Sequence, residues 1–325
     1  MTAVRHGMWA KRIMDFKKKG EYHLSKILQT IISIFYIRFS LNIMKITVLV
    51  DNRTSSPALL SEWGLSLHIS VGNYHLLFDA GADDAFARNA ETLGIDLSKV
   101  DAFILSHSHY DHGNGLNALL QSNRSVQGWR APLPDGICCS KKGTKPARVI
   151  DLRADISALV KKFNEADQLT EILPHIFILP ATLENATWPT PRGNRSQFLR
   201  HTDGTTSPDN FQHELILVIH EGDGLVIFTG CAHSGVCNMI ETTRHHFPDL
   251  PIKAVIGGFH LTSTEGDEAS DESEGEITRI GEYLLAETSG RVWTGHCTSD
   301  RACHILQGVM GERIALMESG LVIEL

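Results

Sequence analysis

The chain has 325 residues, 42% of them hydrophobic, and a formal net charge of −8 at pH 7. This length and apolar content suit one large soluble domain or two smaller ones. The negative charge argues against a nucleic-acid-binding protein, because such proteins need clustered Lys and Arg side chains to contact phosphates.

Residues 1–44 form a basic extension, in which Lys and Arg greatly outnumber Asp and Glu. Its apolar stretch at 27–43 is short and interrupted by Arg38, so no stable membrane span is expected. Three interpretations stay open: a mitochondrial presequence, a membrane-surface anchor, or sequence upstream of a true start at Met44. The last is favoured, because Met44 directly precedes the first predicted strand at 45–50.

The six cysteines show neither a CxxC pair nor the spacing of a disulfide-rich scaffold. A reducing compartment is therefore the simpler expectation. We expect a cytoplasmic protein, or a mitochondrial one if residues 1–44 are a presequence.

From residue 45 onward, short strand-like runs alternate with helical stretches, which predicts a layered α/β domain over 45–325. The region from about 121 to 213 is rich in Pro, Arg and polar residues, and is expected to be a covering insertion. Residues 265–276 are acidic and are expected to form a mobile surface loop. The predicted strands and helices are a hairpin over 64–79, a helix over 83–93, a buried strand over 100–105, a helix from 116, strands at 176–179, 214–219 and 225–228, a helix over 234–246, and strands at 254–256 and 291–293.

The run from His107 to His112 carries the clearest chemical signal. His107 and His109 stand two residues apart after a predicted strand, so both side chains point to the same side, and Asp111 and His112 follow across a turn. Imidazole and carboxylate are ligands that zinc and similar ions accept. Histidines at a strand end can also be a solvent-exposed rim, but four ligand-type side chains within this short run favour a metal site.

One such cluster does not complete two tetrahedral sites, so distal ligands are required. His233, His260 and His296 each follow a predicted strand and a glycine-containing turn. We expect His233 and His296 to be ligands, and His260 to be either a ligand or a substrate contact.

Three further residues adjoin the predicted site. Cys231 and Cys297 stand next to the distal histidines, and either coordinate as thiolates or pack as small buried side chains. Asp79 follows a predicted strand, and is expected either to orient a ligand histidine or to cap a helix.

These residues resemble the metallo-β-lactamase superfamily, whose HxHxDH signature is matched by His107, His109, Asp111 and His112. The resemblance covers about residues 45–325. Further motifs are similar to the dihydropteroate-synthase-like branch of that superfamily, the branch of 7,8-dihydropterin-6-methyl-4-(β-D-ribofuranosyl)aminobenzene-5'-phosphate synthase. They are EWGLSL at 62–67, LFDAG at 77–81, TGCAHSG at 229–235, GGFHL at 257–261 and GHCT at 295–298.

The resemblance implies a four-layer αββα sandwich with one or two Zn²⁺ ions at one edge and a small-molecule substrate. It implies catalytic roles for Asp111 and His260, and substrate contacts from His260 and Glu62. Many superfamily members carry a metal-bridging Asp where this chain has Cys231. The usual histidine before that strand is not obvious among His201, His213 and His220.

The resulting hypothesis is a metal-dependent hydrolase or transferase. The metal would activate water or stabilise a phosphate leaving group of a pterin-like or phosphorylated substrate, with Arg192 or Arg195 as a phosphate contact. One alternative is an iron- or manganese-containing site, with iron supporting an oxidoreductase of the same fold. The other is a non-catalytic metal- or ligand-binding protein.

Overall fold

The computed structural model describes residues 44–181, 186–266 and 269–325. The predicted basic extension therefore lies outside the described residues, except for Met44. Residues 45–323 form one unit, to which the following description applies. Within the described ranges, no helix combines the length and the apolar character needed to cross a membrane.

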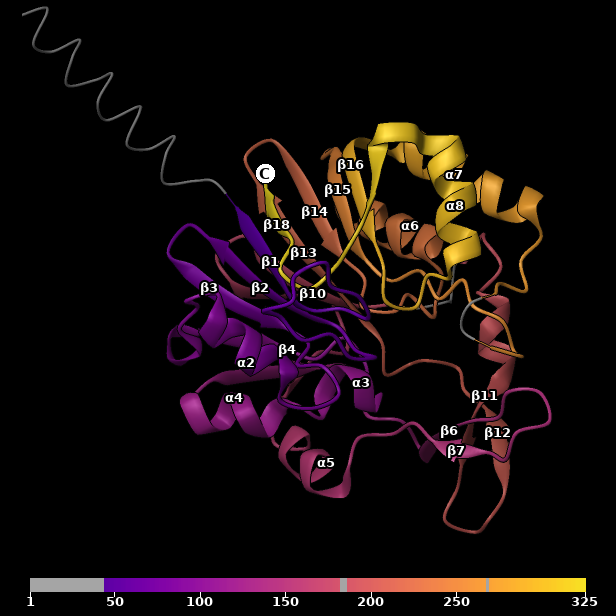
Figure 1. The fold of residues 1–325 in the computed structure, drawn as a ribbon, viewed down its shortest axis with the longest axis horizontal. Helices are drawn as coiled ribbons and strands as arrows, with labels where there is room; N and C mark the ends of the chain where they lie inside the picture. The colour runs from indigo at the N-terminus through magenta and orange to yellow at the C-terminus, as the bar shows by residue number, and fades with distance from the viewer. Residues whose placement is uncertain (1–43, 182–185, 267–268) are drawn as a thin grey trace, which may run out of the picture. The chain divides into compact units, whose positions relative to one another are not determined.

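Two seven-stranded sheets lie at the centre of this unit (Figure 1). The first contains β18 (Val322–Glu324), β1 (Lys45–Val50), β2 (Ser66–Val71), β3 (Tyr74–Phe78), β4 (Ala102–Ile104), β5 (Gln127–Arg130) and β8 (Asn164–Glu165), in that spatial order. The second contains β17 (Ile314–Leu316), β16 (Thr288–Thr294), β15 (Ile252–Gly257), β14 (Gly224–Phe228), β13 (Leu215–Glu221), β10 (Ile176–Pro180) and β9 (Thr170–Leu173). Each sheet has an antiparallel part and a parallel part, the parallel strands being β3, β4, β5 and β8 in one, and β14 to β17 in the other.

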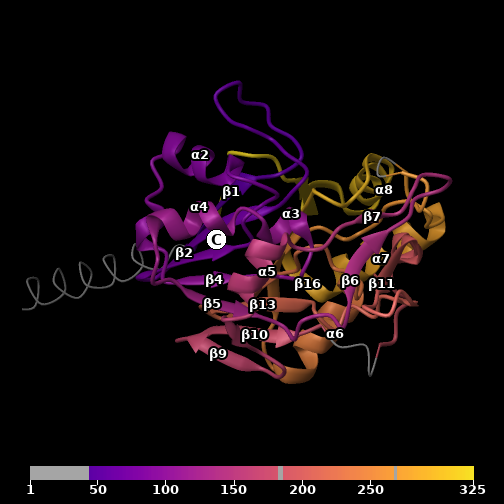
Figure 2. The ribbon, with the colours of Figure 1, turned by 90° about the horizontal axis from the view of Figure 1, so that it is seen from below.

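Helices cover the outer face of each sheet (Figures 1 and 2). The first sheet is covered by α2 (Ala85–Thr92), α4 (Leu116–Ser122) and α5 (Ala154–Val160), and the second by α6 (Val236–His246), α7 (Glu274–Glu287) and α8 (Asp300–Met310). Successive residues of a strand point alternately to the helices and to the other sheet. Leu77 packs with the helices, whereas Phe78 meets Phe228 of the other sheet at a ring distance of 6.0 Å. Because the strands are buried on both faces, their sequences are almost continuously apolar. The predicted αββα sandwich is confirmed.

A separate four-stranded sheet lies within the region expected to be an insertion. Its strands, in spatial order, are β12 (Thr206–Pro208), β11 (Gln197–Arg200), β6 (Ile137–Ser140) and β7 (Arg148–Val149). Its buried side chains Cys138, Ile150 and Leu199 pack against Tyr110 of the His-rich run. The same region also contributes β5 and β8 to the first large sheet, and β9 and β10 to the second. Only this small sheet, which we call the lateral sheet, stands apart from the sandwich.

The acidic stretch predicted as a loop over 265–276 ends earlier than expected, because α7 begins at Glu274. The Ser273 hydroxyl accepts a hydrogen bond from the Glu276 backbone, and the Glu276 carboxylate accepts one from the Ser273 backbone at 2.8 Å. This capping box stabilises the helix start, so the last acidic residues of the stretch are helical.

Candidate metal centre

The candidate ligands follow the carboxyl ends of neighbouring strands. Asp79 follows β3, His107 follows β4, His233 follows β14, His260 follows β15 and His296 follows β16. The parallel pairing of these strands within each sheet brings their ends to one edge, which is where open α/β sheets bind ligands. The two halves of the sandwich therefore both contribute to the centre.

Four non-glycine residues at these turns have a left-handed backbone. The φ angles are 61° at Asp79, 57° at Ala232, 47° at His260 and 49° at His296. Such conformations cost free energy and persist where the surrounding structure imposes them, commonly at functional sites.

A first group of histidines comprises His107, His109 and His233. The Nε2 atom of His107 lies 3.0 Å from Nδ1 of His109 and 3.3 Å from Nε2 of His233. Two ligands of a tetrahedral zinc ion with bonds of about 2.0–2.1 Å are separated by roughly 3.3 Å. The spacing of these nitrogen atoms therefore fits one metal ion.

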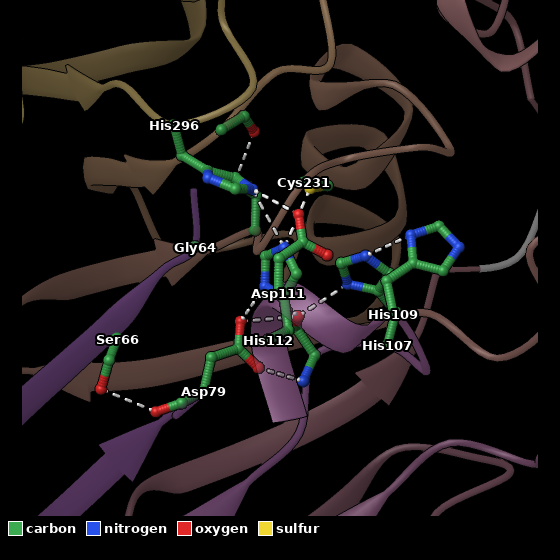
Figure 3. A network of polar contacts seen from close by, with 12 residues as sticks. Gly64, Ser66, Asp79, His107, His109, Asp111, His112, Cys231 and His296 are labelled. Carbon is green, nitrogen blue, oxygen red and sulfur yellow. Dashed lines mark hydrogen bonds and ion pairs between the residues drawn. The ribbon is translucent and has the colours of Figure 1, made fainter. Parts of the chain in front are cut away.

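A second group comprises Asp111, His112 and His296 (Figure 3). His112 Nε2 lies 3.1 Å from His296 Nε2, and His296 Nε2 lies 3.6 Å from the Asp111 carboxylate. The Cys231 sulfur is 3.1 Å from His112 Nε2 and also groups with His107, so it lies between the two histidine sets. The geometry offers two adjacent ion positions with Cys231 between them.

Hydrogen bonds at Nδ1 fix the orientation of four histidine rings. Asp79 Oδ2 lies 2.6 Å from His112 Nδ1, and it also accepts a 2.7 Å bond from the Ser106 hydroxyl. When Nδ1–H donates, the Nε2 lone pair is left facing the centre as a metal ligand requires. The other acceptors are Ser106 Oγ for His107 at 2.9 Å, Asn194 Oδ1 for His233 at 3.0 Å and Asn52 Oδ1 for His296 at 3.1 Å.

Burial also favours the ligand form of these side chains. It lowers the pKa of His107, His109, His233 and His296 well below the usual value, and so keeps these imidazoles neutral. Burial also lowers the pKa of His112, but the Asp79 and Asp111 carboxylates outweigh it, so the net direction is upward. Metal binding requires neutral imidazoles, and burial favours that form at His107, His109, His233 and His296.

The orienting residues Ser106, Asn52, Asn194 and Glu214 were not identified from the sequence. Glu214 is buried and accepts hydrogen bonds from the His233 backbone at 2.7 Å and the Ser234 backbone at 2.8 Å. Burial raises its pKa to about 7. In the sequence, Glu214 stands out only by its position directly before β13, because no local motif includes it.

Glu62 holds the loop after β3. Its carboxylate accepts hydrogen bonds from the backbone of Ala82 at 2.9 Å and of Asp83 at 3.3 Å. It does not line the cavity over the histidines. The substrate contact expected of Glu62 stays a prediction.

His213 lies beside the centre, but its two ring nitrogens are engaged elsewhere. Nδ1 accepts a hydrogen bond from the Ser108 backbone at 3.2 Å, and Nε2 lies 3.2 Å from the Asp209 carboxylate. His213 therefore has no lone pair left to bind a metal, although it packs against His107 and His109.

The expected phosphate contacts Arg192 and Arg195 lie in a neighbouring cavity of about 460 Å³. Arg192 forms an ion pair with Glu276 there. Neither arginine lines the cavity over the histidines, because the turn Arg192–Ser196 directs them to its other side while Asn194 contacts His233.

Comparison with known proteins agrees with this geometry. Residues 66–133 match the Metallo-beta-lactamase superfamily domain. The chain is 24% identical over 295 residues to 7,8-dihydropterin-6-methyl-4-(beta-D-ribofuranosyl)-aminobenzene-5'-phosphate synthase of Methanocaldococcus jannaschii, covering 87% of this chain and 97% of the relative. It is 28% identical over 260 residues to an uncharacterised protein of the same archaeon, covering 79% and 91% of the two chains. The crystal structure of a metal-dependent hydrolase of the beta-lactamase superfamily superposes with a TM-score of 0.70 at 29% identity, covering 87% of this chain and 99% of that one.

Proposed function

We propose that the chain is a metal-dependent hydrolase or transferase of the metallo-β-lactamase superfamily with a dinuclear zinc centre, supported by the family match at residues 66–133 and by the similarity to a solved metal-dependent hydrolase. His107, His109 and His233 would hold one ion. Asp111, His112 and His296 would hold the second, with Cys231 as a ligand that both ions could share. The observation that carries the proposal is the pair of buried nitrogen groups at tetrahedral spacing.

Zinc in this centre would supply a Lewis acid and a bound water that loses a proton near neutral pH. The residues of the chain then orient the reacting groups. A hydrogen bond from Trp63 holds the Asp111 carboxylate, which can accept a proton or a hydrogen bond from an incoming nucleophile. His260 Nε2 accepts a hydrogen bond from the Gln197 amide at 3.3 Å, so its Nδ1–H is left to donate to a substrate oxygen.

The substrate is proposed to be a phosphorylated small molecule with a planar, pterin-like ring. The name of the archaeal synthase motivates this choice. The neighbouring cavity of about 460 Å³ supports it, because the cavity is lined by Trp188, Phe259, Leu261 and Ile280 together with charged side chains. Apolar walls with a few polar groups are typical of sites for small organic ligands. We include a cytoplasmic location in the proposal, in keeping with six cysteines present as buried thiols.

Metal analysis and activity of the purified protein test the proposal. We expect about two zinc ions per chain and turnover in a screen of phosphodiester, lactone and thioester hydrolysis or of transfer with release of pyrophosphate. His233→Ala should lower both metal content and activity, whereas His220→Ala, at the half-buried end of β13, should change neither. Iron with oxygen consumption would point instead to an oxidoreductase, and full metal content in His233→Ala would contradict the ligand assignment.

A further inference from the structure

Four buried polar atoms on one wall of the cavity have no hydrogen-bond partner among the described residues. They are Ser140 Oγ, Gln197 Oε1, His260 Nδ1 and Thr262 Oγ1. Their side chains are between 1% and 9% exposed, and all four line the cavity over the histidines. A buried polar group without a partner costs free energy, so a cluster of them in one cavity indicates a polar ligand.

Two cations complete this wall. Lys142 and Arg148 line the same cavity and stand on either side of the turn that joins β6 to β7. Arg148 lies over the Tyr110 ring at 6.0 Å.

The chemistry of the wall favours an anion. The two hydroxyls and the imidazole N–H can donate, and two cations add charge, whereas Gln197 Oε1 is the one atom of the set that can only accept. The Asp111 carboxylate also lines the cavity, but it lies beside His296 in the second ligand group.

We propose that the lateral sheet is a phosphoryl-recognition wall, in which Lys142, Arg148, Ser140 and Thr262 bind the phosphate dianion of the substrate opposite the metal ligands. This inference rests on the proposed function and names the binding residues that the sequence had placed at Arg192 and Arg195. Two charges of one sign match a phosphate dianion better than a carboxylate. The lateral sheet contributes Ser140 from β6 and Arg148 from β7, which explains why it packs directly on the His-rich run.

Calorimetric titration of the zinc-loaded protein with inorganic phosphate, phenyl phosphate and acetate tests the proposal. Arg148→Gln and Lys142→Met should each weaken both phosphate ligands by about tenfold or more, since each removes a charge-assisted contact. Lys141→Met is the matched control, because Lys141 is exposed on the same hairpin and does not line the cavity. Zinc content and melting temperature should match wild type in all three variants. Tighter binding of phenyl phosphate than of inorganic phosphate would identify a monoester as the natural group, and the reverse order a free phosphate.

Three results would overturn the inference. One is unchanged phosphate affinity in Arg148→Gln and Lys142→Met. Another is an equal loss in Lys141→Met, which would show a long-range charge effect. The third is acetate binding as tightly as phosphate, or a loss that appears only in Arg195→Gln. If wild type binds no zinc, the proposed function fails, but the same titrations of the metal-free protein still decide whether this wall binds phosphate.

Discussion

Asp79→Asn is the sharpest test of how the centre is built. The carboxylate is fully buried and accepts hydrogen bonds from the Ser106 backbone at 2.8 Å, the Ser106 hydroxyl at 2.7 Å and His112 Nδ1 at 2.6 Å. Asparagine preserves the shape but offers only one acceptor oxygen. If that oxygen stays with the Ser106 backbone, the amide N–H₂ faces His112 Nδ1 and shifts the ring proton to Nε2.

The cost follows from that proton shift. His112 Nε2 would then donate rather than coordinate, and removing such an orienting partner typically weakens metal binding by about 10–100-fold. This corresponds to about 1.4–2.7 kcal/mol of zinc-binding free energy. Loss of a hydrogen bond to a charged group should also lower the free energy of unfolding of the metal-free protein by about 1.5–3 kcal/mol.

Zinc affinity is measured by competition with a chromophoric chelator, and stability by urea unfolding. The control is Asp101→Asn, because Asp101 is exposed, precedes the other end of β4, and accepts only a backbone hydrogen bond from His75 at 2.8 Å. If Asp79→Asn keeps wild-type zinc affinity within twofold, the reasoning that Asp79 selects the His112 tautomer is refuted.

Three further outcomes are expected. Cys231→Ala should lower the bound zinc below wild type by elemental analysis, because the Cys231 sulfur lies between both ligand groups; unchanged content would show that the thiol is only packing. Gly258→Ala should destabilise the fold and reduce metal content, since the added Cβ would lie 2.4 Å from the Cys297 sulfur; a wild-type melting temperature would contradict this. Burial lowers the pKa of His68 to about 4, so the unfolded chain takes up a proton first, and stability should fall as the pH drops from about 6.5 towards 4. Between pH 7 and 5, the free energy of unfolding of the metal-free protein should decrease by about 2 kcal/mol. The pH dependence should be smaller in His68→Leu, and an equal dependence in both proteins would disprove the assignment.

The apolar runs of strands that are buried on both faces, as in β13 and β14, predicted a layered α/β domain, and the family resemblance supplied the αββα arrangement. It did not resolve β5 and β8, which are short and carry polar or exposed residues. The start of α7 was not predicted, because its first turn belongs to an acidic stretch. Ser273 and Glu276 form the capping box, but in a stretch of such charge they appeared to belong to a loop.

For the centre, residue type and strand-end position were sufficient to select the histidines that the structure brings together. The orienting side chains could not be found in the same way. Asn52 meets His296 across 244 residues of sequence, and Asn194 contacts His233 from a turn beside the lateral sheet. Such pairings depend on tertiary contacts and leave no local pattern. The role of Glu62 as a backbone acceptor in the loop after β3 was missed in the same way, and the substrate contact that the resemblance implies for it stays a prediction.

Two hydrophobic clusters lie one under each helical layer, and Phe78 and Phe228 join the facing sides of the two sheets. His107 and His112 belong to the half with the first sheet, while His233 and His296 belong to the half with the second. An ion shared by both sets would act as a cross-link between the halves, and unfolding of the domain would release it. The concentration of free zinc would then add to the free energy of unfolding of the whole sandwich. Chelation should therefore lower its melting temperature.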